Sequence, residues 1–375
     1  MNMEFRDLKR QYQILKNEID NAVYQVIYEG NYIHGRQVAE LEKKLAKYVG
    51  AKYCISCANG TDALQIALMA WGIGKDDVVL VPDFTFFSSG EVVSAVGAEP
   101  CFVDVNPVTY NIDSDALINA IAKLLNEAKR PKAIIAVDLF GQPAEHGRIR
   151  EIADEYGLFV LEDGAQGFGG AIGDKMACSF GDISTTSFFP AKPLGCYGDG
   201  GAIFTDNGEW AELMRSYCVH GKGESKYDNV RIGMNSRLDT IQAVVLLAKL
   251  PHFIGWEMKQ MQTVAGWYSE QLKDIVMIPK IKDGFTSSWA QFTIQVANIE
   301  ARDRIVARLM EEGIPSAIYY QKPMHRQMAF SGTSFDERDY LISLRLSETV
   351  LSLPFHPYLN EEEVTKVSEI IRKAL

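Results

Sequence analysis

One lysine in this sequence stands where an amine could act as a nucleophile. Lys192 follows the apolar segment Ser187-Phe188-Phe189-Pro190-Ala191, and the glycines between residues 195 and 201 would allow close backbone approach behind it. A lysine in such a loop loses hydration, which lowers the pKa of its ammonium and frees the amine to attack an aldehyde. Taken alone, this segment could equally well carry a solvated surface lysine. Other residues must therefore show whether Lys192 belongs to a reactive site.

Two further segments could bind a charged ligand. Asp163 and Gln166 follow the apolar run 158–161, so a carboxylate stands where a strand should end and could face a cationic nitrogen. Gly60 and Thr61 follow another apolar run and open a helix, whose free N–H groups suit a phosphate. Acids are common at strand ends, however, and a helix cap by Asn59 or Thr61 accounts for the second segment as well.

An aromatic segment completes the set. Phe84-Thr85-Phe86-Phe87 follows a third apolar run, and we expect Phe84 and Phe87 to lie in the core. Because ligands collect at the carboxyl ends of parallel strands, a phosphate cradle, an aromatic ring, an acid and a lysine would share one site. These are the parts that a pyridoxal phosphate site needs.

The chain must fold as alternating strands and helices to bring these groups together. Between Tyr53 and Thr205, short apolar runs alternate with amphipathic stretches, which is typical of βα units in a mostly parallel sheet. The predicted strands are 53–57, 78–81, 100–105, 133–137, 158–161, 183–186 and 201–205. Helices are predicted at 38–49, 61–71 and 114–127, the last capped by Ser114.

The organisation changes after residue 238. A long helical stretch from Leu238 to about Leu272, broken near Pro251, would connect two domains. Beyond it, the sequence predicts a smaller α+β unit, with strands at 288–296 and 316–320 and helices at 302–312 and 361–374. At about 150 residues per domain, a chain of 375 residues fits two domains.

Composition excludes several classes of protein. The 38 basic and 49 acidic residues give a net charge of −11, which disfavours nucleic acid as a partner. No stretch approaches a membrane span, and the charged N-terminus differs from a signal peptide, so we expect a cytoplasmic protein. Cys54 and Cys57 lack a second pair of ligands, so we expect buried thiols there and no metal site in the chain.

Over nearly its whole length the chain resembles the DegT/DnrJ/StrS group of fold-type I, pyridoxal-phosphate-dependent nucleotide-sugar aminotransferases. Within the group it is most similar to the aminotransferases of UDP-2-acetamido-2-deoxy-3-oxo-glucuronate. The resemblance implies an α/β, aspartate aminotransferase-like fold, with a large domain at 1–245 built on a mostly parallel seven-stranded sheet and a small α+β domain at 246–375. The matching segments are 30–35, 58–64, 162–166, 187–192, 198–201 and 235–239.

The resemblance also implies a role for each matching residue. Lys192 corresponds to the lysine that bonds to the cofactor aldehyde and later carries the transferred proton. Asp163 corresponds to the carboxylate that keeps the pyridine nitrogen protonated. The other cofactor contacts would be Phe86 and Ala165 on the two ring faces, Gln166 on the ring hydroxyl, and Gly60, Thr61, Ser187 and the partner subunit's Asn235 on the phosphate.

Substrates and partners follow from the same resemblance. L-Glutamate would give its amino group to a keto group of a nucleotide-linked sugar and leave as 2-oxoglutarate, in a homodimer with shared sites. The favoured acceptor is a UDP-2-acetamido-2-deoxy-3-oxo-hexose or hexuronate, used to make amino sugars for polysaccharides such as O-antigen. The sugar nucleotide would contact Gly30, Tyr32, Arg237, Tyr319 and Tyr320, and the Arg237 guanidinium suits a carboxylate or phosphate.

Departures from the family pattern leave the sugar open. Ala191 and Tyr319 stand where the nearest members carry serine and histidine, and specificity depends on such polar groups. Transfer to C4 of a UDP- or dTDP-4-keto-6-deoxy sugar is therefore the alternative within the class. A non-catalytic regulatory protein that binds the cofactor or the sugar is the alternative outside it, but Asp163 and Lys192 are both present.

Overall fold

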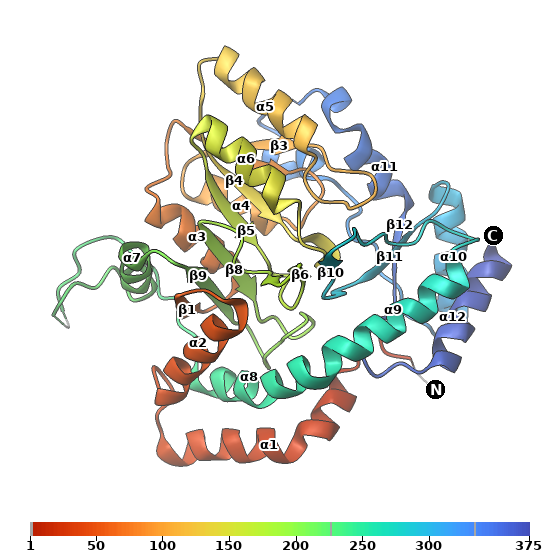
Figure 1. Ribbon diagram of the computed structural model, residues 1–375, viewed down its shortest axis with the longest axis horizontal. Helices are drawn as coiled ribbons and strands as arrows, with labels where there is room; N and C mark the ends of the chain where they lie inside the picture. The colour runs from red at the N-terminus through yellow and green to blue at the C-terminus, as the bar shows by residue number, and fades with distance from the viewer. Residues whose placement is uncertain (1–2, 226, 334) are drawn as a thin grey trace.

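A seven-stranded sheet forms the centre of the computed structural model, which describes residues 3–225, 227–333 and 335–375 (Figure 1). The strand order is β1-β9-β8-β5-β4-β2-β3, and only β9 runs antiparallel to its neighbours. The strands are β1 (Tyr53–Cys57), β2 (Asp77–Pro82), β3 (Glu99–Val103), β4 (Arg130–Val137), β5 (Phe159–Asp163), β8 (Ile183–Ser187) and β9 (Gly201–Thr205). The predicted mostly parallel sheet is thus confirmed.

The sheet is covered by helices on both faces because its strands are apolar on both sides. In β2, Val79 and Val81 pack in one layer of the core, whereas Val78 and Leu80 pack in the other. The first layer contains α3 (Gly60–Ala70), α4 (Ser88–Ala95) and α7 (Gly208–Cys218). The second contains α5 (Ser114–Asn126) and α6 (His146–Tyr156).

The N-cap of α5 is not the predicted residue, Ser114. Asp113, not Ser114, is the cap, because its side chain accepts hydrogen bonds from the N–H groups of Asp115 and Ala116.

The long C-terminal helical stretch is continuous, which corrects the predicted break near Pro251. α8 (Thr240–His252) passes through a single π-helical segment, Phe253–Glu257, into α9 (Met258–Leu272). A π turn absorbs the mismatch that proline creates in the hydrogen-bond ladder without ending the helix. Two N-terminal helices lie against α8: α1 (Leu8–Glu29), which the sequence analysis missed, and α2 (Arg36–Val49).

The C-terminal part contains a two-stranded antiparallel sheet, β11 (Phe292–Gln295) and β12 (Val350–Leu353), with α10 (Ile299–Glu311), α11 (Leu341–Thr349) and α12 (Glu361–Ala374). The predicted strand at 316–320 is wrong, because only Ala317 forms a bridge there, to Ser352. Three two-residue strands, β6 (Ala171–Ile172), β7 (Lys175–Met176) and β10 (Phe285–Thr286), form a small separate sheet.

One hydrophobic core runs through both parts of the chain. It joins Leu41 of α2 and Phe204 of β9 to Phe292 of β11 and Ile305 of α10. The division into domains at 1–245 and 246–375 therefore stays a prediction. Among the described residues, no helix has the length and apolar character needed to cross a membrane.

Candidate active site

The expected acid lies buried at the carboxyl end of the sheet. Asp163 ends β5 and is only 5% exposed. Its Oδ2 accepts a hydrogen bond from the Ser89 hydroxyl at 2.9 Å, and its Oδ1 accepts one from the Ala165 N–H at 3.2 Å. Burial raises the pKa of Asp163, while the Ser89 bond and the positive charge of Lys192 oppose this. The carboxylate is thus held in one orientation by two donors.

Lys192 lies half-buried in the loop that follows β8, the strand next to β5 in the sheet. Its backbone N–H donates to the Phe189 carbonyl at 2.9 Å. Loss of hydration lowers the pKa of the Lys192 ammonium, Asp163 opposes this, and the positive charge of Arg6 adds to it. The structure therefore gives Lys192 the depressed basicity that a nucleophilic amine requires.

The backbone around α3 forms a narrow cradle. The Asn59 side chain caps α3 by accepting from the Asp62 N–H at 2.8 Å, whereas the N–H groups of Gly60 and Thr61 stand in the first turn, where helices offer no internal acceptor. A Cβ on Gly60 would lie 2.8 Å from Ser187 Cβ, and one on Gly201 would lie 2.5 Å from the Asn59 carbonyl oxygen. The contacts of Gly60 with Ser187 and of Gly201 with Asn59 thus leave room for a glycine hydrogen but not for a methyl group.

Aromatic side chains form a wall beside the acid. Phe86 is 54% exposed, and its ring centroid lies 6.3 Å from that of Tyr320. Phe84 is fully buried behind the same tyrosine, and Phe87 packs partly buried against the core, as expected. The Gln166 side chain donates to the Tyr320 hydroxyl at 3.1 Å and accepts from the Phe140 N–H at 2.7 Å.

Four of the remaining predicted residues, Gly30, Tyr32, Asn235 and Arg237, lie near the start of α8. The Tyr32 carbonyl accepts a hydrogen bond from the Thr240 N–H at 2.8 Å, which places the segment from Gly30 to Tyr32 beside the start of α8. Asn235 and Arg237 lie just before α8, and Asn235 is exposed. Among the described residues, no hydrogen bond or ring contact joins these four to Lys192 or Asp163. Tyr319 instead packs against Tyr320 and Phe5.

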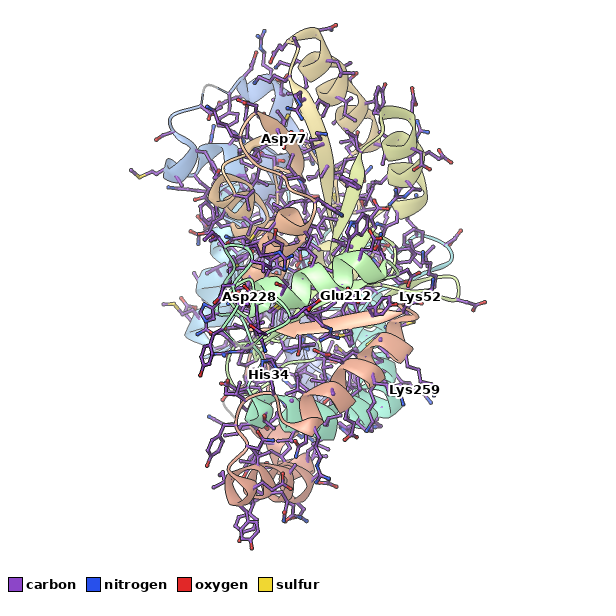
Figure 2. All side chains as sticks on the ribbon, turned by 90° about the vertical axis from the view of Figure 1, so that its left-hand side faces the viewer. His34, Lys52, Asp77, Glu212, Asp228 and Lys259 are labelled. Atoms are coloured by element: carbon purple, nitrogen blue, oxygen red, sulfur yellow. The ribbon has the colours of Figure 1, made fainter. Side chains whose placement is uncertain are left out.

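The segment between α7 and α8 projects from the body of the protein (Figure 1). Figure 2 looks onto the side from which it projects, with Asp228 labelled on it. Ile232 of this segment is 90% exposed. Its apolar side chain thus faces outward shortly before Asn235.

Two residues at the site were missed by sequence reasoning. Ser89 orients Asp163 although 74 positions separate them, and only its place shortly after Phe86 could have suggested a role. Arg6 donates to the carbonyl of Lys192 at 3.3 Å across 186 positions, and no local sequence signal announces this contact.

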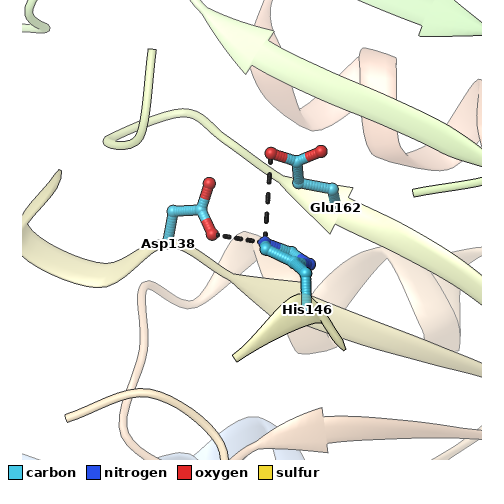
Figure 3. A group of neighbouring side chains, drawn as sticks. All are labelled: Asp138, His146 and Glu162. Atoms are coloured by element: carbon cyan, nitrogen blue, oxygen red, sulfur yellow. Dashed lines mark hydrogen bonds and ion pairs between the residues drawn. The ribbon is translucent and has the colours of Figure 1, made fainter. Parts of the chain in front are cut away.

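A second buried polar group lies at the carboxyl ends of the central strands β4 and β5 (Figure 3). His146 Nε2 lies 2.8 Å from Asp138 Oδ1 and 4.0 Å from Glu162 Oε1, an arrangement that could hold a cation. The Glu162 carboxylate, however, already accepts bonds from the N–H groups of Cys178 and Phe180 and from the Ser184 hydroxyl. Glu162 is therefore satisfied by hydrogen bonds, whereas Asp138 Oδ2 and His146 Nδ1 are buried without a hydrogen-bond partner among the described residues.

Burial sets the charges in this cluster. It raises the pKa of Asp138 and of Glu162 to about 7, and it lowers the pKa of His146 to about 4. The imidazole is thus neutral at neutral pH, and the two carboxyls titrate there.

Comparison with known proteins places this chain in a family. The family model described as the DegT/DnrJ/EryC1/StrS aminotransferase family matches residues 13–372. The chain belongs to this family. It is therefore a pyridoxal-phosphate-dependent sugar aminotransferase, and its α/β architecture is that of fold-type I.

Individual relatives cover almost the whole chain. It is 44% identical to the UDP-2-acetamido-2-deoxy-3-oxo-D-glucuronate aminotransferase of Pseudomonas aeruginosa, covering 96% of this chain and 97% of that one. A solved aminotransferase of the same family from Brucella abortus is 50% identical, with a TM-score of 0.96 and 99% of each chain covered. A Bacillus subtilis structure with bound PMP cofactor is 30% identical, with a TM-score of 0.87, covering 96% of this chain and 82% of that one.

Pyridoxal phosphate fits the residues present. Glycine at positions 60 and 201 avoids clashes with Ser187 and with the Asn59 backbone, and the N–H groups in the first turn of α3 suit a phosphate. The buried carboxylate of Asp163 suits a cationic ring nitrogen, and the amine of Lys192 lies near enough for the two charges to interact.

Proposed function

We propose that this aminotransferase moves the amino group of L-glutamate to the keto group of a nucleotide-linked sugar, with a UDP-2-acetamido-2-deoxy-3-oxo-hexose or hexuronate as acceptor. The observation that carries the proposal is that the half-buried Lys192, in the loop after β8, and the buried Asp163, at the end of the neighbouring strand β5, lie at the same end of the sheet. The choice of sugar is supported by the 44% identity to the Pseudomonas aeruginosa enzyme.

Within this proposal each residue of the site has a separate task. Bound pyridoxal phosphate supplies an electron sink, and its ring nitrogen must stay protonated for that purpose. Asp163 holds that proton, Lys192 takes and returns the proton at the reacting carbon, and Gln166 binds the ring hydroxyl. Phe86 and Ala165 enclose the ring, and the phosphate is held by Gly60, Thr61 and Ser187.

The proposal includes a homodimer with shared sites. Asn235 and Ile232 are exposed, which supports burial of the projecting segment against a second copy. In the dimer Asn235 would reach the partner's phosphate site, and Arg237 would bind a carboxylate or phosphate of the sugar nucleotide together with Gly30, Tyr32, Tyr319 and Tyr320. Sedimentation of the purified protein should give twice the mass of one chain.

The position of transfer and the setting belong to the same proposal. Transfer at C3 is favoured over transfer at C4 of a UDP- or dTDP-4-keto-6-deoxy sugar. Assays in reverse, with 3-amino and 4-amino nucleotide sugars and 2-oxoglutarate, distinguish the two. A cytoplasmic location and a product used in polysaccharides such as O-antigen remain predictions from the sequence.

Visible absorbance tests the proposed reaction. With added pyridoxal phosphate the protein should show a yellow band that L-glutamate bleaches and a keto-sugar nucleotide restores. Lys192→Ala should abolish turnover and leave the fold intact, whereas Lys175→Ala, at a lysine that lies over Phe180 outside the site, should behave as wild type. A band that ignores glutamate would favour the regulatory, non-catalytic alternative.

A further inference from the structure

The N-terminal segment is fastened to the loop that carries Lys192. The Phe5 carbonyl accepts a hydrogen bond from the Phe355 N–H at 3.1 Å, and the Phe5 ring lies edge-on to Tyr319 at 6.3 Å. Next to it, the half-buried Arg6 guanidinium donates to the carbonyl of Lys192 at 3.3 Å and to that of Ala290 at 3.5 Å. One side chain thus bridges the Lys192 loop and the segment before β11.

Positive charge is in excess behind this loop. Besides Arg6, the buried Lys249 donates to the Gly195 carbonyl of the same loop at 2.7 Å. The facing acid is Glu257 of the π-helical segment, which is 3% exposed and bonded to Gln11 and to the Tyr358 hydroxyl. Burial lowers the pKa of Lys249 to about 8, and Glu257 partly opposes this.

We propose that Arg6 is a positioning residue for the transfer reaction: its guanidinium holds the backbone carbonyl of Lys192 and brings a permanent positive charge to the Lys192 loop. The proposal rests on the proposed function, because it assumes that Lys192 is the reacting lysine. Two charged groups act on that amine. Asp163 from β5 favours the ammonium form, and Arg6 from the N-terminal segment favours the neutral amine that can attack an aldehyde.

A variant pair in the same segment tests this role. Arg6→Gln removes the charge and the bridge, whereas Arg10→Gln removes a similar bond, from Arg10 to the Tyr358 carbonyl at 2.9 Å, without touching Lys192. The readout is the pH dependence with which an amine-selective reagent labels Lys192 in the cofactor-free protein, followed by peptide mass spectrometry. This measurement reports the amine itself and needs no turnover.

The expected results are specific to Arg6. In Arg6→Gln the labelling midpoint should rise by about one pH unit, so that about tenfold less neutral amine is present at pH 7. Arg10→Gln should keep the wild-type midpoint. Arg6→Lys should keep a midpoint close to that of wild type, because it retains the positive charge. Should Arg6→Gln not fold, Arg6→Met retains the apolar stem and tests the same loss of charge.

Two results would overturn the inference: an unchanged midpoint in the folded neutral variant, or an equal shift in Arg10→Gln, which would reflect docking of the segment as a whole. Failure of the proposed function looks different. In that case wild-type protein would show no absorbance band that responds to glutamate, whatever the labelling midpoints of the Arg6 variants.

Discussion

Replacing Asp138 with asparagine should remove a loss of stability that the wild-type protein undergoes as the pH rises to about 7. Burial raises the folded pKa of Asp138 from 3.8 to about 7. Between these values the unfolded chain releases a proton that the folded protein keeps, so the stability from this group is full below about pH 4 and is lost as the pH rises to about 7. In the Asp138→Asn variant the amide oxygen would still accept from the Ala144 N–H and from His146, and it would carry no charge.

The size of the effect follows from the same linkage. From pH 5 to pH 7 the loss of folding stability spans two pH units, or about 2.7 kcal/mol. The loss is counted for one carboxyl group only, because Asp138 and the neighbouring Glu162 titrate as a coupled pair. His146 works in the opposite sense, because its lowered pKa removes stability only as the pH falls from 6.5 toward 4. With an unfolding entropy of about 2.1 cal/mol/K per residue, the gain corresponds to about 3 °C in Tm.

Thermal melts at pH 5 and pH 8 measure this directly. The Tm advantage of Asp138→Asn over wild type should be about 3 °C larger at pH 8 than at pH 5. Asp154→Asn serves as the matched control on the neighbouring helix α6, since Asp154 is exposed and pairs with Arg150 at 3.5 Å. The reasoning is refuted if Asp138→Asn lowers Tm equally at both pH values.

Two further predictions concern the cofactor. Asp163→Asn should leave pyridoxal phosphate partly bound but lower turnover by on the order of 100-fold, and steady-state assays with a cofactor titration check it; unchanged turnover would remove Asp163 from the reaction. Gly201→Ala should weaken cofactor binding about 10- to 100-fold, because the new Cβ would lie 2.5 Å from the Asn59 carbonyl oxygen and force the backbone of the cradle apart. Gly147→Ala, at an exposed helical position with open space around it, should leave the affinity measured in the same titration unchanged.

Local pattern was sufficient for the sheet but not for every helix. Six of the seven strands contain a short apolar run, and burial on both faces explains why such runs lie in a parallel sheet. The exception is β8, in which serines and threonines follow Ile183. α1 was missed because only four of its 22 residues are buried, so its position depends on α8 rather than on its own pattern. Pro251 predicts the loss of a backbone hydrogen bond in the helix. It does not predict that the helix continues through a π-helical segment.

The strand-end rule also placed Asp163 at the end of a strand, and Gly60 and Lys192 shortly after strands, and the structure has them there, while their roles stay predictions. Glu162 and Asp163 alternate across β5, so one enters the polar cluster and the other the site. The second set of contacts was beyond reach of local reasoning. Ser89 and Arg6 contact Asp163 and Lys192 only after distant segments have packed. The residues next to Ser89 and Arg6 in the sequence do not indicate those partners.

The continuous core has a consequence for how substrates enter. Because Phe204 and Phe292 belong to one buried apolar cluster, separating the two parts of the chain would expose that surface to water. The two parts of the chain should therefore stay together while substrates are exchanged. A chain cut at residue 245 would leave Phe204 and Leu41 without much of their packing, so the N-terminal part should not be stable in isolation.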